Sequence, residues 1–436
     1  MIIRFSVKNF RSYKEENTLN FVSSSKITTY PDHEKKFGRL SVVKNIGIFG
    51  SNAFGKSNIL NALGAMVNLV VRGSCHENIG FIDNPEEPTK FDLVFITDDK
   101  KIYEYTYTIK KENVLNPFVV LNEDLYQLFL NGSSKVIYSR NNGGLCDNDS
   151  EALRIFAQGY QNINGQLFLR YINAPERFVP DNEISVLLRK IFKFFVSNVF
   201  VTLDNDPMLF LINKENIPSI TNYLKKYDIG IKEVGFVGLL PNEIESITRD
   251  PIFNMIKKEF QEHSSLKDQY FTNGKEIFNI SRSENDFVFQ KLVFRHKGVK
   301  NDFCFGYESN GTQRIFTLLA LLFDKKNTNT TIVVDEIEKS AFTTVIEELI
   351  KDFQKEFKDT NTQLVFTSHL HSLFDAVLRR DEIYFVDKNS NGESYLYSLS
   401  DFKTKTRDNV TKEFLDGSFG AIPKIGVELK YDGSSN

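Results

Sequence analysis

Hydrophobic and polar residues alternate along the start of the chain. Ile3 to Phe10 has a period of two, which predicts a strand with one buried face. Asp92 to Thr97 and Tyr103 to Lys110 show a similar pattern on either side of the polar turn Asp98 to Lys100. These two segments predict a pair of strands joined by a short turn, so the first third of the chain is expected to be rich in strands.

A different pattern begins after a polar stretch. Asn141 to Gly144 and Asp147 to Ser150 predict a loop, and helical spacing follows from Glu151 onward. Residues 151–300 mix helices with short strands and contain no heptad run long enough for an extended coiled coil. We expect a mostly helical lobe at 151–300, inserted into the rest of the chain.

The last third returns to buried strands that alternate with helices. Thr331 to Val334 and Gln363 to Thr367 read as buried strands, and the amphipathic segment Thr343 to Phe357 lies between them. Near the start of the chain, the apolar run Lys44 to Phe49 is followed by the helical pattern Ser57 to Val71. The predicted fold class is therefore α/β, with a core built from residues 1–150 and 301–436.

The turn between that early strand and its helix reads GxxxxGKS, the pattern of a P-loop. The motif and its next residue are Gly50, Ser51, Asn52, Ala53, Phe54, Gly55, Lys56, Ser57 and Asn58. In such a loop, backbone N–H groups surround phosphates, Lys56 reaches the β and γ oxygens, and the Ser57 hydroxyl joins the shell of a Mg²⁺ ion. The alternative is a glycine turn that caps an ordinary helix. The strand–loop–helix setting favours nucleotide binding.

Two carboxylates, Asp335 and Glu336, follow the predicted strand that ends at Val334. This is the Walker B arrangement, in which Asp335 would hold the Mg²⁺ shell and Glu336 would polarise the attacking water. Acidic residues after strands are common, so the interpretation depends on the P-loop. Because Lys56 and Asp335 are far apart in sequence, both ends of the chain are expected to fold into one site.

Two further segments are weaker candidates. Ser309, Gly311 and Gln313 precede an apolar-faced helix and would suit a phosphate, although such clusters also cap helices routinely. His369 follows the strand that ends at Thr367 and could contact a γ-phosphate, and His371 competes for that role. A His-x-His metal pair and an ordinary surface histidine stay open as alternatives.

Composition restricts the class of protein. The 436 residues carry a formal net charge of −3 and have a pI near 6.2, which argues against broad nonspecific binding of nucleic acid or anionic membrane. Cys75, Cys146 and Cys304 are widely spaced, so neither a disulfide framework nor a zinc ribbon is expected. No apolar run is long enough to span a bilayer, and no secretory leader is evident. We expect a soluble cytoplasmic protein without membrane association.

The order of these motifs resembles a known family. NFRSY at 9–13, GSNAFGKS, SNGTQR, VVDEIEKS and TSH are similar to the ABC-type ATPases of the RecF, SMC and OLD grouping. The closest resemblance is to the stand-alone AAA-labelled subgroup that includes RloA and the PARIS ATPase AriA. The segments 378–388 and 417–423 look like the tail of that subgroup.

The resemblance implies ATP and Mg²⁺ as ligands and a homo-oligomer of at least two copies. Each site would combine the Walker motifs of one protomer with the Ser309 to Gln313 signature of another. Arg11 would lie near the nucleotide, and His369 would act as the switch histidine. The chain departs from its relatives at Ser340 to Phe342, where a histidine is common, and it shows no clear Q-loop near Glu86 to Asp92. A Toprim nuclease is not expected after His369, because too few residues follow.

Three functions fit this pattern. The leading hypothesis is an ATPase that acts as sensor or scaffold in a bacterial anti-phage system and controls a separate effector, a nuclease or a toxin. The alternative is a RecF-like ATPase that binds DNA during repair or maintenance. A nonhydrolytic, nucleotide-gated protein would not need the acid at Glu336. A GTPase is disfavoured because Asn213-Lys214 continues as Glu-Asn and does not give the NKxD string.

Overall fold

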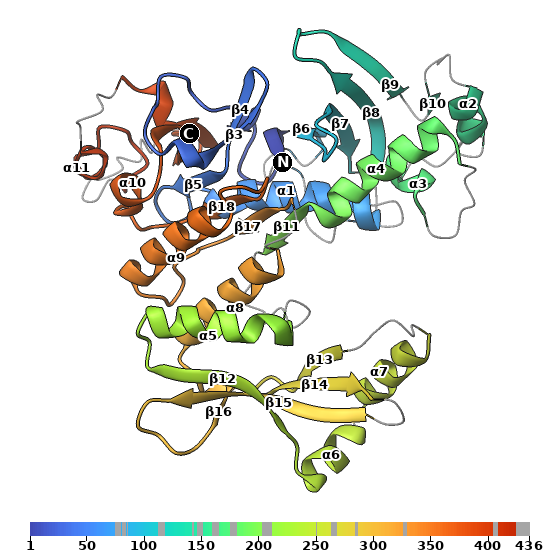
Figure 1. Cartoon of the computed structure of the whole chain (residues 1–436). Coiled ribbons are helices and arrows are strands. Elements are labelled where there is room, and N and C mark those ends of the chain that lie inside the picture. Colours follow the sequence, from blue (N-terminus) through green and yellow to red (C-terminus); the bar gives the residue numbers. More distant parts are fainter. Residues whose placement is uncertain are drawn as a thin grey trace, which may run out of the picture. The chain divides into compact units, whose positions relative to one another are not determined.

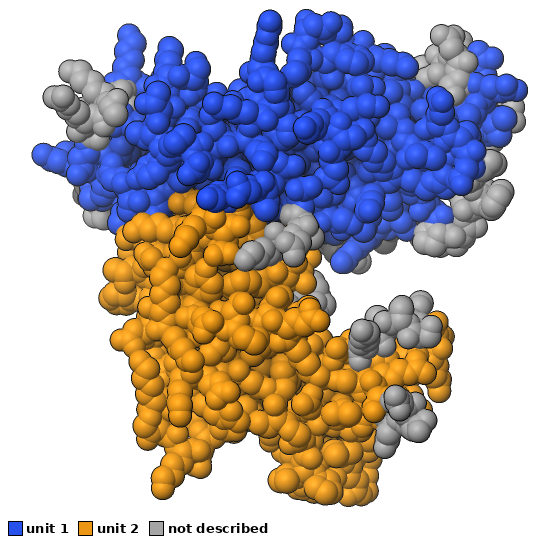
Figure 2. All heavy atoms as spheres, in the orientation of Figure 1, with its two compact units in different colours: residues 1–203, 328–337, 358–436 blue, residues 204–327, 338–357 orange. Residues whose placement is uncertain are grey.

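The computed structural model describes most of the chain. The described residues are all of 1–436 except 75–79, 81–83, 85, 112–117, 142–143, 146–150, 159–164, 175–180, 203–211, 250, 263–267, 284–286, 326–328, 404–408 and 424–436. Internal contacts divide the chain into two compact units, coloured separately in Figure 2. Unit 1 comprises residues 1–203, 328–337 and 358–436, and unit 2 comprises residues 204–327 and 338–357.

Unit 1 contains a six-stranded, mostly parallel sheet assembled from distant parts of the sequence (Figure 1). Its order is β11 (Val199–Thr202), β17 (Thr331–Val334), β18 (Gln363–Thr367), β5 (Asn45–Phe49), β19 (Ile383–Lys388) and β20 (Ser394–Ser398). The first five strands are mutually parallel, and β20 pairs antiparallel with β19. Strands such as β5 and β17 are buried along their whole length, as expected for a parallel sheet covered on both faces.

Unit 1 also contains a seven-stranded antiparallel sheet. Its order is β10 (Gly144–Leu145), β9 (Ser134–Asn141), β8 (Val119–Leu128), β7 (Ile102–Lys110), β6 (Thr89–Ile96), β1 (Ile2–Lys8) and β2 (Asn17–Asn20). The predicted early strand is β1, and the predicted strand pair is β6 and β7, which are antiparallel neighbours. A separate pair joins β3 (Glu34–Phe37) to β4 (Leu40–Val43).

One hydrophobic core serves both sheets. The helix α1 (Lys56–Arg72) buries Leu60, Leu63 and Met66 in the same cluster as Phe91 of β6 and Val365 of β18. The other α-helices in the described part of unit 1 are α2 (Glu151–Gln158), α3 (Phe168–Ile172), α4 (Glu183–Ser197), α10 (Leu373–Ala376) and α11 (Val410–Leu415). Helix α4 lies in the segment after Glu151 where helical spacing was predicted, and it buries Phe194 and Phe195.

Gln363 links the two sheets at the start of β18. Its amide accepts the N–H of Ile2 over 2.6 Å and donates to the carbonyl oxygens of Ile2 and Val43 over 3.0 and 3.1 Å. The hydroxyl of Thr331 donates to the same side-chain oxygen over 2.9 Å. Because these groups are buried, their hydrogen bonds fix how the early strands join the parallel sheet.

Unit 2 combines a five-stranded sheet with helices. The sheet order is β12 (Ile231–Gly238), β15 (Phe287–His296), β14 (Ile277–Arg282) and β13 (Asp268–Thr272), and β16 (Phe303–Cys304) also pairs with β15. The helices are α5 (Ile217–Lys226), α6 (Pro241–Thr248), α7 (Pro251–Glu262), α8 (Asn310–Asp324) and α9 (Thr343–Glu356). Aromatic residues of α7 pack with β13 and β14 in a small core.

The α/β class and the construction of the parallel sheet from both ends of the chain are confirmed. The segment 151–300 is mixed in content, because it holds β11 to β15 as well as α2 to α7. Contacts place the start of unit 2 at 204, and they assign α8 and α9 to it. The domain boundaries suggested by the sequence stay a prediction. The loop expected at Asp147 to Ser150 lies outside the described residues.

Candidate nucleotide-binding site

The turn from β5 to α1 has the backbone shape of an anion-binding loop. Gly50, Ala53 and Gly55 have positive φ values of 144°, 62° and 112°. Left-handed residues among right-handed ones turn successive N–H groups toward one side of a loop. Gly55 is also the N-cap of the 17-residue α1 and has no side chain to cap it, which leaves the first N–H groups of the helix for a ligand.

Lys56 lies over this loop. Its ammonium donates to the carbonyl oxygens of Gly50 and Ser51 over 2.9 and 3.1 Å, and the residue is 7% exposed. The side chain is therefore folded back along the turn that the sequence assigns to phosphate. This arrangement fits a nucleoside triphosphate, since a cation and converging N–H groups lie together at a helix N-terminus.

Neighbouring segments brace the loop on several sides. The Tyr13 hydroxyl donates to the carbonyl of Gly55 over 3.1 Å, and the Ser394 hydroxyl donates to the carbonyl of Phe54 over 2.5 Å. The N–H of Ser51 donates to the carbonyl of Ala421 over 3.0 Å. Residues from three distant parts of unit 1 thus fix the shape of the loop.

The two glycines of the motif, Gly50 and Gly55, occupy positions where a larger residue would be unfavourable. A Cβ on Gly50 would lie 2.4 Å from the carbonyl oxygen of Val386, and one on Gly55 would lie 2.5 Å from the hydroxyl of Ser394. Both positions also have positive φ, so another residue would be strained there as well as crowded.

Arg11 lies beside the first turn of α1. Its guanidinium donates to Oδ1 of Asn58 over 3.3 Å, and the amide of Asn58 donates to the hydroxyl of Ser12 over 2.8 Å. The expectation that Arg11 lies near the nucleotide is compatible with this position. Its contact with nucleotide stays a prediction.

The Walker B carboxylates lie at the same sheet edge as the P-loop. β17, β18 and β5 are parallel neighbours, with Val334 opposite Phe366 and Thr367 opposite Ile48. Asp335 and Glu336 therefore leave the sheet on the side where Gly50 follows β5. Glu336 has a left-handed backbone, with φ of 45°. Catalytic groups of α/β proteins gather at this edge.

His369 also follows a strand of this edge, β18, and is partly buried. His371 is packed among aromatic rings, with centroids 4.8 Å from Phe414 and 5.9 Å from Phe374. Burial, together with the nearby His369, lowers the pKa of His371 below its usual range. His371 is thus held in an aromatic cluster, which leaves His369 as the better candidate for a phosphate contact.

The signature segment lies in unit 2, at the start of α8. Ser309 is the N-cap, and its hydroxyl accepts the N–H of Thr312 over 3.1 Å. The side-chain amide of Gln313 donates to the carbonyl of Glu308 over 2.9 Å. A Cβ on Gly311 would lie 2.6 Å from the carbonyl oxygen of Ser340, so this glycine allows close approach of the turn after Walker B. The helix cap and the candidate signature are therefore the same residues.

The residues predicted to bind Mg²⁺ are few. Among the described residues, no cluster of three or more His, Cys, Asp or Glu side chains has the geometry of a metal site. Ser57 and Asp335 would then supply only part of a Mg²⁺ shell, and phosphate oxygens and water would supply the rest. This is how Mg²⁺ is usually held beside nucleotides, so the residues present fit the ion.

A comparison with known families identifies the chain. Residues 46–375 match the family described as "AAA domain, putative AbiEii toxin, Type IV TA system". The chain belongs to this family. The match begins in β5, includes the P-loop and the Walker B carboxylates, and ends after His369. Membership of this family supports the interpretation of the domain as an ATPase domain with a P-loop. The closer resemblance to RloA and AriA stays a prediction.

Solved structures give a more distant likeness. Similar chains include an Smc head bound to the C-winged helix domain of ScpA, with 12% identity, a TM-score of 0.41 and coverage of 91% of this chain and 97% of that one. The SMC head domain from Thermotoga maritima has 14% identity, a TM-score of 0.36 and coverage of 91% and 98%. The Smc head domain with an extended coiled coil from Pyrococcus furiosus has 13% identity and a TM-score of 0.38, and the match covers 92% of this chain and 97% of that one. No curated protein matches the chain.

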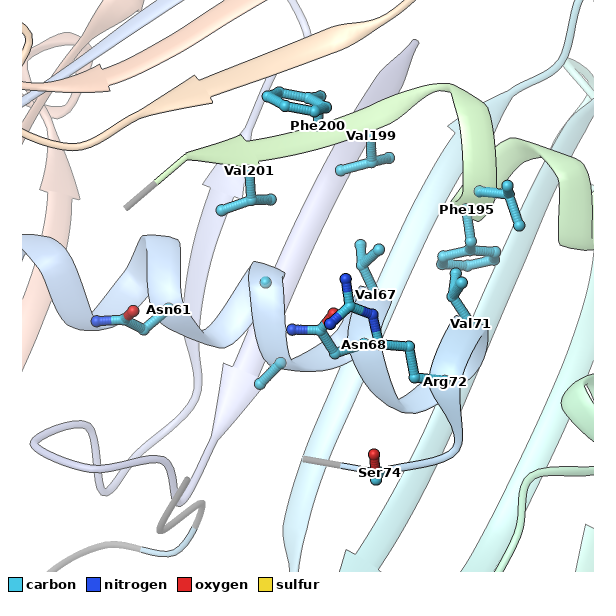
Figure 3. Close-up of a pocket in the computed structure, with 13 residues that line it drawn as sticks. Asn61, Val67, Asn68, Val71, Arg72, Ser74, Phe195, Val199, Phe200 and Val201 are labelled. Atoms are coloured by element: carbon cyan, nitrogen blue, oxygen red, sulfur yellow. The ribbon is translucent and has the colours of Figure 1, made fainter. Parts of the chain in front are cut away.

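The AAA domain also has a hollow away from the P-loop (Figure 3). It occupies about 340 Å³ between α1 and β11, and Val67, Val71, Phe195, Val199 and Val201 supply its apolar lining. It lies along the middle and end of α1, and none of its lining residues belongs to the P-loop or Walker B motifs. This hollow is therefore separate from the loop at the start of α1, which is predicted to hold the nucleotide.

Tyr13, Ser394 and Ala421 were not predicted to support the site. Ser394 and Ala421 lie hundreds of residues from the loop that they brace, and a lone serine or alanine has no pattern that would mark this role. Cys75 and Cys146 lie outside the described residues, while Cys304 is a free, partly buried thiol. In the part of the chain that the structure describes, no helix has the length and apolarity to span a membrane.

Proposed function

We propose that this AAA-domain protein binds and hydrolyses ATP with Mg²⁺. The observation that carries the proposal is the shared sheet edge, where the P-loop after β5 and the Walker B carboxylates after β17 lie two strands apart. The loop conformation and the position of Lys56 support phosphate binding at that edge.

Each residue has a separate role in this proposal. Backbone N–H groups of the P-loop and Lys56 hold the phosphates, and Ser57 and Asp335 hold the Mg²⁺, which neutralises phosphate charge when bound. Glu336 orients and polarises the attacking water, and His369 contacts the γ-phosphate. Catalysis would then rest on positioning and electrostatics, as is usual for phosphoryl transfer.

We propose that hydrolysis requires a second copy of the chain. The signature around Ser309 and Gly311 presents a helix N-terminus, which suits the phosphate of a nucleotide held by another protomer. A lone protomer would bind ATP but turn it over slowly. The assembly would be at least a dimer.

The proposed biological role is that of a sensor or scaffold in bacterial anti-phage defence. The family description names a toxin and a Type IV toxin–antitoxin system, which is compatible with a toxin as the effector, whereas the anti-phage role rests on the resemblance in sequence motifs. ATP-dependent association would hold or release a separate effector, a nuclease or a toxin, in the cytoplasm. The alternative, a RecF-like DNA maintenance ATPase, predicts salt-sensitive binding of DNA.

A binding and turnover assay tests the proposed activity. The wild-type chain should bind ATP and release phosphate when Mg²⁺ is present. Lys56→Ala should weaken ATP binding, because the ammonium is lost from the loop. Lys101→Ala, at an exposed lysine of the β6–β7 turn, is the matched control and should behave as the wild type. A wild-type chain with no affinity for ATP would contradict the proposal.

The genetic neighbourhood separates the two biological roles. An adjacent gene for a nuclease or toxin would support control of an effector. A replication or repair operon, together with DNA binding that weakens as salt rises, would support the RecF-like alternative.

A further inference from the structure

Thr367 ends β18, and its hydroxyl contacts both Walker B residues. Oγ1 donates to Oδ1 of Asp335 over 2.5 Å and accepts the backbone N–H of Glu336 over 2.7 Å. A threonine hydroxyl has one hydrogen to donate and two lone pairs, so a single hydroxyl can make both bonds. Thr367 is fully buried, which shields these bonds from water.

The backbone after Asp335 needs such support. Glu336 has a φ of 45°, which residues other than glycine rarely adopt. Its N–H is bound to the Thr367 hydroxyl, and the next N–H, of Ile337, donates to the Thr367 carbonyl over 3.1 Å. Thr367 therefore holds two successive N–H groups of the turn that carries the candidate general base.

The same hydroxyl orients the carboxylate of Asp335. A carboxylate with one oxygen fixed by a hydrogen bond cannot rotate freely, so the direction of its second oxygen is set as well. Residues that hold a metal ligand in this way strongly affect metal affinity or activity. Thr367 is placed to set the geometry of the metal ligand and of the base together.

We propose that Thr367 is a positioning residue for Mg²⁺–ATP binding and hydrolysis, acting through Asp335 and through the backbone of Glu336. This inference rests on the proposed ATPase function. It adds a residue that would not itself touch nucleotide and that links the end of β18 to the Walker B turn.

The test compares two valine substitutions. Thr367→Val keeps the shape and removes the hydroxyl. Thr331→Val is the matched control, because Thr331 is also a fully buried threonine of the same sheet, but its hydroxyl bonds to Gln363 at the opposite end of β17. Thr367→Ser retains the hydroxyl and should restore Mg²⁺-dependent ATP binding and turnover. Melting temperatures show that each variant is folded.

Two readouts distinguish positioning from a structural role. The first is the ratio of ATP affinity measured with Mg²⁺ to that measured in EDTA, which needs no turnover. The second is kcat at saturating Mg²⁺–ATP. Thr367→Val should lower the affinity ratio and kcat by about 10- to 100-fold, the usual cost of losing a partner that orients a metal ligand. Affinity in EDTA should stay close to that of the wild type.

The outcomes separate this inference from the proposed function. If Thr367→Val matches Thr331→Val in both readouts while the wild type turns over ATP, the inference is wrong and the ATPase proposal stands. If the wild type binds no ATP, the proposed function fails first. Should Thr367→Val not fold, Thr367→Ala against Thr331→Ala gives the same comparison.

Discussion

At the scale of single residues, Glu336 combines a strained backbone with a position suited to catalysis. Its backbone has a left-handed φ of 45°, and only Asp335 separates it from the end of the buried strand β17. Strain of this kind persists only where neighbouring groups hold it, and it is often found at functional sites. The side chain is a carboxylate at the sheet edge where the P-loop begins, which is why we assign it the role of general base.

Glu336→Gln should therefore bind ATP and fail to hydrolyse it efficiently. Glutamine keeps the size of the side chain but cannot accept a proton, and loss of a positioned base typically lowers turnover by about 10²- to 10⁴-fold. Phosphate release and ATP affinity would be measured side by side. Glu259→Gln on an exposed position of α7 is the control, and equal turnover in the two variants would remove Glu336 from this role.

Lys44 gives a prediction that depends on pH. Burial lowers its pKa from 10.5 to about 8, and its ammonium donates to the carbonyl of Lys358. Because the unfolded chain binds this proton more tightly than the folded chain, the contribution of Lys44 to stability rises as pH increases from about 8 to 10.5.

The difference in stability between the wild type and Lys44→Met should therefore change with pH. The stability of the wild type relative to the variant should increase across that window and stay constant well below it. Melting temperatures of both chains from pH 7 to pH 10 would show the trend. A difference that does not change with pH would contradict the shifted pKa.

At the scale of elements, the first turn of α8 is held against the turn that follows Walker B. Gly311→Ala would place a Cβ 2.6 Å from the backbone oxygen of Ser340, and a backbone atom cannot move aside cheaply. Overpacking of this kind costs about 1–3 kcal/mol. We expect a lower melting temperature for Gly311→Ala.

Gly235→Ala in β12 is the control for this prediction. A Cβ there meets no atom within 4 Å, and Gly235 belongs to the same unit. The control should melt near the wild type. If both alanine variants melt alike, the close approach of Gly311 to Ser340 does not contribute to stability.

Elements whose identity depends on local pattern were predictable from the sequence. β1, β6, β7, α1, α4, α9 and β18 follow from hydrophobic periodicity, since one face or the whole element is buried. The P-loop is visible because its glycines and Lys56 have a fixed spacing. Periodicity does not encode pairing between distant strands, so the place of β11 beside β17 could not be derived from it.

The residues that support the P-loop could not be predicted from the sequence for a related reason. Tyr13 is one of many buried tyrosines, and Ser394 lies in a strand with no special composition. Their role depends on a single hydrogen bond to a loop carbonyl, which tertiary structure alone creates. The candidate binding and catalytic residues could thus be predicted from the sequence, while the residues that hold the loop in shape could not.

At the scale of the whole molecule, the chain passes between its two units directly after the Walker B turn. Glu336 and Ile337 belong to unit 1, and unit 2 resumes at Glu338. Ser340, which Gly311 approaches, lies only two residues further on. The Walker B turn is therefore close in sequence to Ser340, the residue that the candidate signature approaches.

Association of two copies is the claim that connects these features to function. Ser309→Arg places a bulky cation at the N-cap of α8, where it should block approach of a second protomer while the P-loop still binds ATP. The lost cap alone costs about 1 kcal/mol, so the variant is expected to stay folded. Sedimentation with ATP would show a monomer for Ser309→Arg and a dimer for Glu336→Gln.

The most direct test mixes two inactive variants. Lys56→Ala lacks the P-loop cation, and Ser309→Ala lacks the signature hydroxyl but adds no bulk that would block association, so neither should hydrolyse ATP alone. In a mixed dimer, the intact P-loop of one copy meets the intact signature of the other. We expect the mixture to hydrolyse ATP although each variant is inactive by itself. A mixture no more active than the sum of its parts would contradict a shared site.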